Sequence, residues 1–141
     1  MQIKQVSVFL ENVSGSLGQI VSIIAEAGVT IKAMNVMDIR EYGVLRMIVS
    51  DAQKAESHLK NHGIAVKTGD VTAIDASDNP GDVDRILAIL DQAGINLSYL
   101  YGFTATNTGR MALIFKCDDW QKAEKTLEEN NIRLECDNLF E

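Results

Sequence analysis

The chain shows two hydrophobic periodicities in turn, one typical of strands and one typical of helices. Residues 3–10 are apolar and β-branched and predict a strand. At 16–27 the apolar residues are spaced three and four apart, which predicts an amphipathic helix that ends at Gly28. Asp51 is the expected N-cap of a second helix. That helix is predicted at residues 51–63, and the remaining strands at residues 30–39, 44–50 and 64–67.

The same pattern then occurs a second time. Gly81 lies 66 residues after Gly15, and the apolar helix positions and the terminating glycine follow at the same offset. The offset rises to 68 where Gln53-Lys54-Ala55-Glu56 reappears as Gln121-Lys122-Ala123-Glu124. An internal duplication of this kind indicates two copies of one structural unit. The second copy predicts strand, helix, strand, strand, helix and strand at residues 71–75, 81–93, 96–104, 111–117, 119–130 and 133–137.

Each copy therefore has the order βαββαβ, which is typical of a ferredoxin-like sandwich. We predict an α+β protein of two such repeats, at residues 1–68 and 69–141, with antiparallel sheets that carry their helices on one face. Only Thr68-Gly69 separates the copies, and so short a link favours rigid packing over independent motion. With the usual strand order 4-1-3-2, Cys117 and Cys136 would lie two strand spacings, roughly 10 Å, apart, too far for a disulfide.

Composition narrows the function classes. The 141 residues include 13 Lys and Arg against 20 Asp and Glu, for a net charge of −7, and no basic run is present. Nucleic-acid affinity depends largely on Lys and Arg, so a nucleic-acid partner is not expected. No apolar stretch has the roughly 20 residues of a membrane span, and the N-terminal sequence lacks the features of a signal peptide. We therefore expect a cytoplasmic protein with no membrane partner.

The duplicated glycine turns are the best candidates for chemistry. A short turn from strand into helix leaves the first helical N–H groups without partners, and the helix dipole adds positive charge there. A carboxylate suits such a place. Ser14, Ser16, or Asn79 followed by Pro80 at the first helical position, would cap these helices. The alternative interpretation is that both turns are capping turns and nothing more.

These residues resemble a known family. The first turn reads Glu11-Asn12-Val13-Ser14-Gly15-Ser16-Leu17 and its helix leads into Gly28-Val29-Thr30-Ile31; the second reads Asp78-Asn79-Pro80-Gly81-Asp82-Val83, before Gly94-Ile95-Asn96-Leu97. Over its whole length the chain resembles a tandem of ACT domains, whose turn is often Asp/Asn-x-Pro-Gly-x-Leu. ACT domains are small regulatory modules that bind amino acids in enzymes such as phosphoglycerate dehydrogenase and aspartate kinase. Ser14 stands where that family often has proline.

The resemblance implies that two such units associate edge to edge and hold an effector between them. In serine-binding relatives one Asn of the turn and one at the start of the second strand hold the ligand; Asn12 matches the first and Asn96 the second, in different repeats. Thr30 and Asp78 occupy the counterpart positions. One good site, two unequal sites and no site all remain open. The candidate ligand-binding residues are Asn12, Val13, Ser14, Gly15, Ser16, Leu17, Met34, Asn35, Asp78, Asn79, Pro80, Gly81, Asp82, Val83, Asn96, Tyr99 and Tyr101.

Several of these candidates have a second interpretation. Asp78 or Asp82 would pair with a ligand ammonium group, or would simply complement the helix dipole. Tyr99 and Tyr101 alternate with Phe103 on one strand face and would line the ligand pocket, the core or an oligomer contact.

His58 and His62 are four residues apart on a predicted helix, so both could reach one metal ion, but no third metal ligand is evident.

No P-loop, GxSxG, HExxH or useful Cys/His arrangement is present. We therefore predict a non-catalytic regulatory protein with neither cofactor nor metal. It is expected to bind a free amino acid at the interface of its repeats, to form a homodimer or bind an enzyme of amino-acid metabolism, and to transmit the ligand state to that partner. An interaction module without a ligand and a small ferredoxin-like enzyme are the alternatives.

Overall fold

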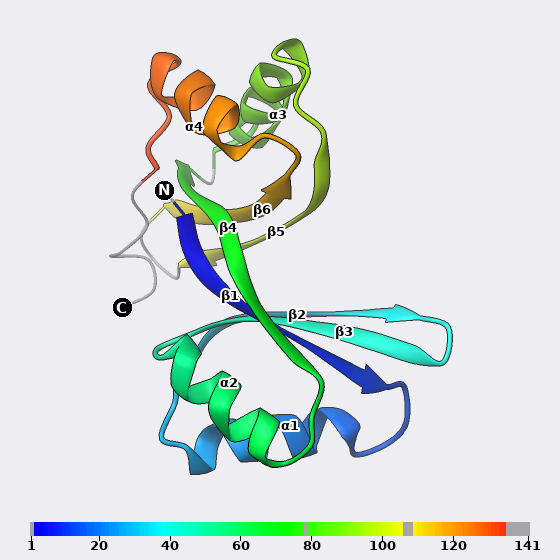
Figure 1. Ribbon diagram of the computed structural model, residues 1–141. Helices are drawn as coiled ribbons and strands as arrows, with labels where there is room; N and C mark the ends of the chain where they lie inside the picture. The colour runs from blue at the N-terminus through cyan, green and yellow to red at the C-terminus, as the bar shows by residue number, and fades with distance from the viewer. Residues whose placement is uncertain (1, 78, 106–108, 135–141) are drawn as a thin grey trace. The chain divides into compact units, whose positions relative to one another are not determined.

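The computed structural model of the chain describes residues 2–77, 79–105 and 109–134 (Figure 1). Strands and helices follow one another in the predicted order, except that one strand replaces the two predicted at 64–67 and 71–75, and this order confirms the α+β class. No helix in these residues combines the length and the apolar character needed to cross a membrane. The elements are β1 (Gln2–Glu11), α1 (Ser16–Glu26), β2 (Ile31–Ile39), β3 (Tyr42–Val49), α2 (Ala52–Asn61), β4 (Val66–Ser77), α3 (Asp82–Gln92), β5 (Leu97–Ala105), β6 (Arg110–Cys117) and α4 (Trp120–Glu129).

Hydrogen bonds connect the strands in the order β2-β3-β1-β4-β6-β5. The chain divides into two compact units: a first unit, Lys4–Asp70, and a second unit made of residues 1–3 and 71–141. Strands β1 and β4 each contribute residues to both units.

In the first unit, β3 pairs antiparallel with both β1 and β2. Figure 1 shows α1 and α2 on one face of these strands. Alternate strand residues point at the helices, so Val6, Leu45 and Met47 are fully buried together with Ile24 of α1. The N–H of Phe9 donates to the carbonyl of Ala65 at 3.1 Å, which brings the last segment of the unit beside β1 and gives the expected order 4-1-3-2.

The second unit repeats this arrangement. Strand β6 pairs antiparallel with β4 and β5, and α3 and α4 cover one face (Figure 1). Phe115 of β6 is fully buried in its core, with Leu90 of α3 and Leu127 of α4. Arg133 forms an isolated antiparallel bridge with Asp75 of β4, so the last described segment lies beside β4. The rest of the strand predicted at 133–137 lies outside the described residues.

The predicted link between two separate strands at the junction of the copies is wrong. The sequence predicted separate strands at 64–67 and 71–75 with Thr68-Gly69 as a link, whereas β4 runs through both residues as one strand, Val66–Ser77. Glycine favours a turn when the chain needs a positive φ, but Gly69 has none. Because the link also lacks proline, the backbone stays extended and passes from one unit to the other within β4.

Candidate ligand-binding site

Both glycine turns have the same backbone conformation. Gly15 precedes α1 with φ 91° and ψ −15°, and Gly81 precedes α3 with φ 88° and ψ −8°. This left-handed conformation costs an ordinary residue about 1–2 kcal/mol, which explains why glycine recurs. Apart from its own chain neighbours, a Cβ built on either glycine would meet no atom of the described residues within 4 Å. Open space therefore lies beside each turn, and the backbone alone requires glycine.

The helices after these turns begin without side-chain caps. In the other two helices, Asp51 accepts a hydrogen bond from the N–H of Lys54 at 3.0 Å and Asp119 accepts one from Lys122 at 3.1 Å. Within the described residues, α1 and α3 have no such bond. The second and third N–H groups of these helices accordingly have no described partner; they belong to Leu17, Gly18, Val83 and Asp84.

The predicted caps are therefore wrong. Glycine itself occupies the N-cap position, so no side chain is available there to accept a hydrogen bond. Ser14 lies one residue before that position and Ser16 is already the first helical residue. Asn79 and Pro80 both precede Gly81, so Pro80 is not at the first helical position.

The two asparagines singled out by the sequence lie in different units. The side-chain amide of Asn12 donates to the carbonyl of Arg40 at 3.3 Å, which ties the first turn to the turn between β2 and β3. Asn96 lies just before β5, where its backbone N–H donates to the Asp118 carboxylate at 3.2 Å. Both side chains are exposed and accessible to a ligand.

Two of the candidate ligand-binding residues, Met34 and Asn35, lie next to each other on β2 and point in opposite directions. Met34 lies opposite Met47 of β3, whereas Asn35 lies opposite Arg46. Successive residues of a strand face opposite sides of the sheet, so these two side chains do not share one surface. Met34 is 43% exposed.

Tyr99 and Tyr101 do share one face of β5. They lie opposite Lys116 and Ile114 of β6, and both are half-buried. Phe103 follows on the same face, opposite the buried Ala112. The aromatic stripe is thus partly covered within the chain.

The acidic residues of the second turn are engaged locally. One carboxylate oxygen of Asp82 accepts from the backbone N–H of Ser77 at 2.8 Å, and the other lies 3.6 Å from Nε of Arg85. Asp82, at the start of α3, therefore links this helix to the end of β4 through Ser77. Asp78, the other candidate, lies outside the described residues.

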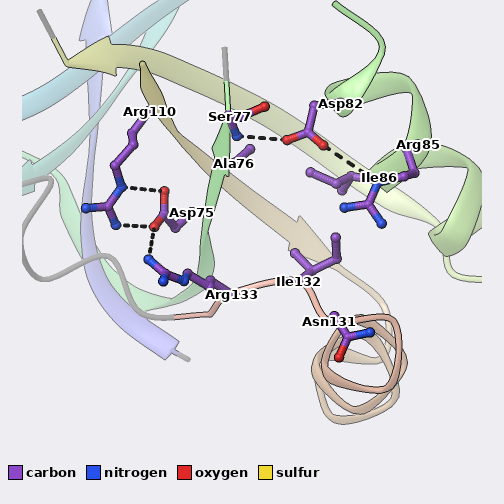
Figure 2. Close-up of a pocket in the computed structure, with 10 residues that line it drawn as sticks. All are labelled: Asp75, Ala76, Ser77, Asp82, Arg85, Ile86, Arg110, Asn131, Ile132 and Arg133. Carbon is purple, nitrogen blue, oxygen red and sulfur yellow. Dashed lines mark hydrogen bonds and ion pairs between the residues drawn. The ribbon is translucent and has the colours of Figure 1, made fainter. Parts of the chain in front are cut away.

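A cavity of about 360 Å³ lies beside this second turn. Figure 2 shows Arg110 and Arg133 directed at Asp75, and Asp82 between Ser77 and Arg85. Arg110 donates to both carboxylate oxygens of Asp75, through Nε at 3.1 Å and through a terminal nitrogen. Arg133 adds an ion pair at 3.7 Å. The cavity is lined by Asp75, Ala76, Ser77, Asp82, Arg85, Ile86, Arg110, Asn131, Ile132 and Arg133.

Comparison with known proteins places the chain in a family. A model of the ACT domain pair matches residues 1–140. The chain belongs to the ACT domain pair family. A crystal structure of a Bacteroides thetaiotaomicron protein is 31% identical, with a TM-score of 0.90, and the match covers 96% of this chain and 92% of that one. No curated protein sequence matches the chain.

More distant similarity agrees on the fold. The regulatory subunit of aspartate kinase from Thermus thermophilus, in its ligand-free form, is 14% identical with a TM-score of 0.64, over 89% of this chain and 91% of that one. The corresponding subunit from Thermus flavus is also 14% identical, with a TM-score of 0.63 over 92% and 94%. The resemblance drawn from the glycine turns is thereby confirmed, as are the tandem ferredoxin-like repeats.

The histidines of this ACT domain pair are held by its own backbone. Nδ1 of His58 donates to the carbonyl of Lys54 at 3.0 Å, and Nδ1 of His62 donates to that of His58 at 2.8 Å. Over the described ranges, no three His, Cys, Asp or Glu residues are grouped to hold a metal ion. Cys117 is a free, buried thiol whose pKa is raised by burial, and Cys136 lies outside the described residues.

Sequence reasoning missed the charged cavity. Asp75, Arg110 and Arg133 are far apart in the chain, and the pairing of β4 with β6 and the Asp75–Arg133 bridge bring them together. Arg85 lines the same cavity from α3, after the second turn. One available signal would have found all four. Aligning the repeats at the offsets of 66 and 68 places a neutral residue opposite each of them: Asp75 on Phe9, Arg85 on Gln19, Arg110 on Val44 and Arg133 on Ala65.

Proposed function

We propose that this ACT domain pair is a non-catalytic regulatory protein that binds a free amino acid at its glycine turns. The observation that carries the proposal is the contrast among the four helices. Two begin with an Asp cap, whereas the two that follow a glycine turn have uncapped N–H groups beside open space. An α-carboxylate complements such N–H groups and the positive end of the helix dipole.

Asn12 and Asn96 are the side chains we assign to the ligand. Each amide group has two N–H donors, and the one described contact of the Asn12 amide, to Arg40, leaves a donor for a carboxylate. Asp82 is bonded to Ser77 and paired with Arg85, so we assign it the task of shaping the second turn. The ligand's ammonium group would then be held by other residues.

Regulation would follow from linkage. A ligand that binds only one arrangement of the protein stabilises it by RT ln(1 + [L]/Kd), about 2.7 kcal/mol when the ligand is present at a hundred times Kd. A partner that contacts the same arrangement gains affinity by the same free energy. We propose a second copy of the chain, or an enzyme of amino-acid metabolism, as that partner.

The test is a thermal-shift screen of the purified protein against the twenty amino acids at millimolar concentration. Binding predicts that one or two of them raise the melting temperature by several degrees. The variants Asn12→Ala and Asn96→Ala should weaken the response, whereas Asn61→Ala, an exposed control at the end of α2, should not. If no amino acid stabilises the protein, the proposal fails.

A second function is favoured by one observation. Strand β2 lies at the end of the strand order and exposes three large apolar side chains, Met34, Val36 and Met37, at 43%, 45% and 44%. Exposed apolar strands mark protein-binding surfaces. A module that binds a protein without any small ligand would give a flat amino-acid screen and a mass above that of one chain in gel filtration. A strict monomer in that experiment would count against it.

A further inference from the structure

The charged cavity of the second unit has a counterpart in the first. A cavity of about 380 Å³ lies there between the end of β1, the first turns of α1 and residues 63–65. Its nine lining residues all correspond, at the offsets of 66 and 68, to residues that line the second cavity. The cavity is therefore a feature of the repeat and is present in both copies. The first cavity is lined by Phe9, Leu10, Glu11, Ser16, Gln19, Ile20, Gly63, Ile64 and Ala65.

The chemistry of the two cavities differs although their place in the fold is the same. Glu11 is the single charged residue that lines the first. Among the described residues that line the second are three arginines and two aspartates, which together carry a charge of +1 in a chain whose net charge is −7. The charged residues replace neutral ones: Asp75 stands at the position of Phe9, Asp82 at Ser16, Arg85 at Gln19, Arg110 at Val44 and Arg133 at Ala65.

The first repeat shows that the fold does not need these charges. It builds the same turn, helix and strands with neutral residues at all five of these positions, and its core residues Val6 and Ile24 are fully buried. Burying a carboxylate such as Asp75, whose side chain is 4% exposed, is costly unless it is paired. A set of charges that the fold can do without, and that is costly to bury, points to recognition of a ligand.

The arrangement leaves arginine donors facing the cavity. Asp75 is held on both oxygens by Arg110, and Asp82 is held by the backbone of Ser77. The ion pairs of Arg85 and Arg133 with these acids, at 3.6 and 3.7 Å, are longer than hydrogen bonds. Their side chains are 56% and 75% exposed, and each guanidinium has five N–H donors. The aspartates thus orient these two arginines without using up their donors.

We propose that this cavity binds the carboxylate of a small organic acid, with Arg85 and Arg133 as the donors. The guanidinium fork matches a planar carboxylate and forms paired, charge-assisted hydrogen bonds with it. The charge of +1 on the described lining residues complements a single carboxylate group, with any second carboxylate of the ligand left in solvent, better than a phosphate group, which concentrates up to two negative charges at neutral pH. A cavity of about 360 Å³ limits the ligand to a small molecule. This proposal does not depend on amino-acid binding at the turns.

Isothermal titration calorimetry of the full chain tests it with succinate, glutamate, glutamine and inorganic phosphate. The variants Arg85→Gln and Arg133→Ala introduce the residues of the first repeat, which that unit accommodates at the same places. We expect succinate or glutamate to bind, and each variant to weaken the binding by roughly ten- to a hundredfold. Lys32→Ala removes one exposed positive charge from β2 and should leave the affinity unchanged.

Four results would overturn the proposal. The first is that neither succinate nor glutamate binds at millimolar concentration. The second is that Lys32→Ala weakens binding as much as Arg133→Ala, which would mean that net charge alone attracts the anion. The third is that phosphate binds through Arg85 and Arg133 while the carboxylates do not. The fourth is that glutamine binds as tightly as glutamate and that Arg85→Gln does not change this affinity. Binding would then take place at the glycine turns, and the charged cavity would have no ligand.

Discussion

Removing Arg110 should destabilise the second unit far more than removing an exposed partner of equal charge. Arg110 is 33% exposed, whereas the Asp75 side chain that it contacts is 4% exposed. The variant Arg110→Val introduces the residue that the first repeat has and leaves the buried carboxylate with Arg133 alone, 3.7 Å away. Breaking a buried pair costs about 3–5 kcal/mol. Because Arg110 is partly solvated and Arg133 remains, we expect a loss of about 2–3 kcal/mol in the free energy of unfolding.

Urea unfolding, followed by circular dichroism, measures this loss. The double variant Asp75→Ala with Arg110→Val removes both charges, and should cost less than the sum of the single variants because neither partner is left buried alone. The control is Lys4→Ala, since the ion pair of Lys4 with Asp70, although only 2.8 Å long, is 62% and 51% exposed. Such a surface pair contributes about 0–1 kcal/mol. If Arg110→Val cost no more than Lys4→Ala, the reasoning about burial would be refuted.

Three further outcomes are expected. Asp51→Ala and Asp119→Ala should each lower the free energy of unfolding by about 1 kcal/mol in urea titrations, because each removes a helix cap; no loss would mean that these bonds do not stabilise the helices. Leu127→Ala should cost about 2–5 kcal/mol in the same assay, since the side chain is fully buried; a loss under 1 kcal/mol would contradict the core described for the second unit. In a Cys136→Ser variant, Cys117 should react with a thiol reagent slowly in the native protein and quickly in urea. Burial raises the pKa of Cys117, so its contribution to stability is present below the ordinary thiol pKa and is lost as the pH rises through the raised value; fast native labelling at neutral pH would contradict this.

Most of the fold could be predicted from the sequence because the same pattern of strands and helices occurs in both repeats. Apolar spacing located α1 and α3, and the terminating Gly28 and Gly94 marked where these two helices end. The cap Asp51 and the repeated Gln-Lys-Ala-Glu segment located α2 and α4. Asp51 was correctly predicted as an N-cap because Asp just before a helix commonly accepts a hydrogen bond from the first backbone N–H groups. The continuity of β4 was not predicted because a pair such as Thr68-Gly69 is typical of a link between elements, and the sequence does not show that the backbone there is extended.

The candidate site was less predictable. The glycine turns were found, but their caps were assigned to serines and an asparagine, since the sequence does not show that glycine would itself occupy the N-cap position. The Asp75 network depends on strand register and on the bridge to Arg133, both long-range features that periodicity does not reveal. The comparison of the two repeats carried that information, because each charged residue has a neutral counterpart at a fixed offset.

Amino-acid binding at the turns is tested most directly by nuclear magnetic resonance. The amide signals of ¹⁵N-labelled protein would be followed while the amino acid that gives the largest thermal shift is added. The account predicts that the shifts concentrate on the uncapped N–H groups after the glycine turns, those of Leu17, Gly18, Val83 and Asp84. The amides of the capped helices, such as Lys54 and Lys122, should stay in place. Shifts that leave both turns untouched, or no shift with any of the twenty amino acids, would contradict the account.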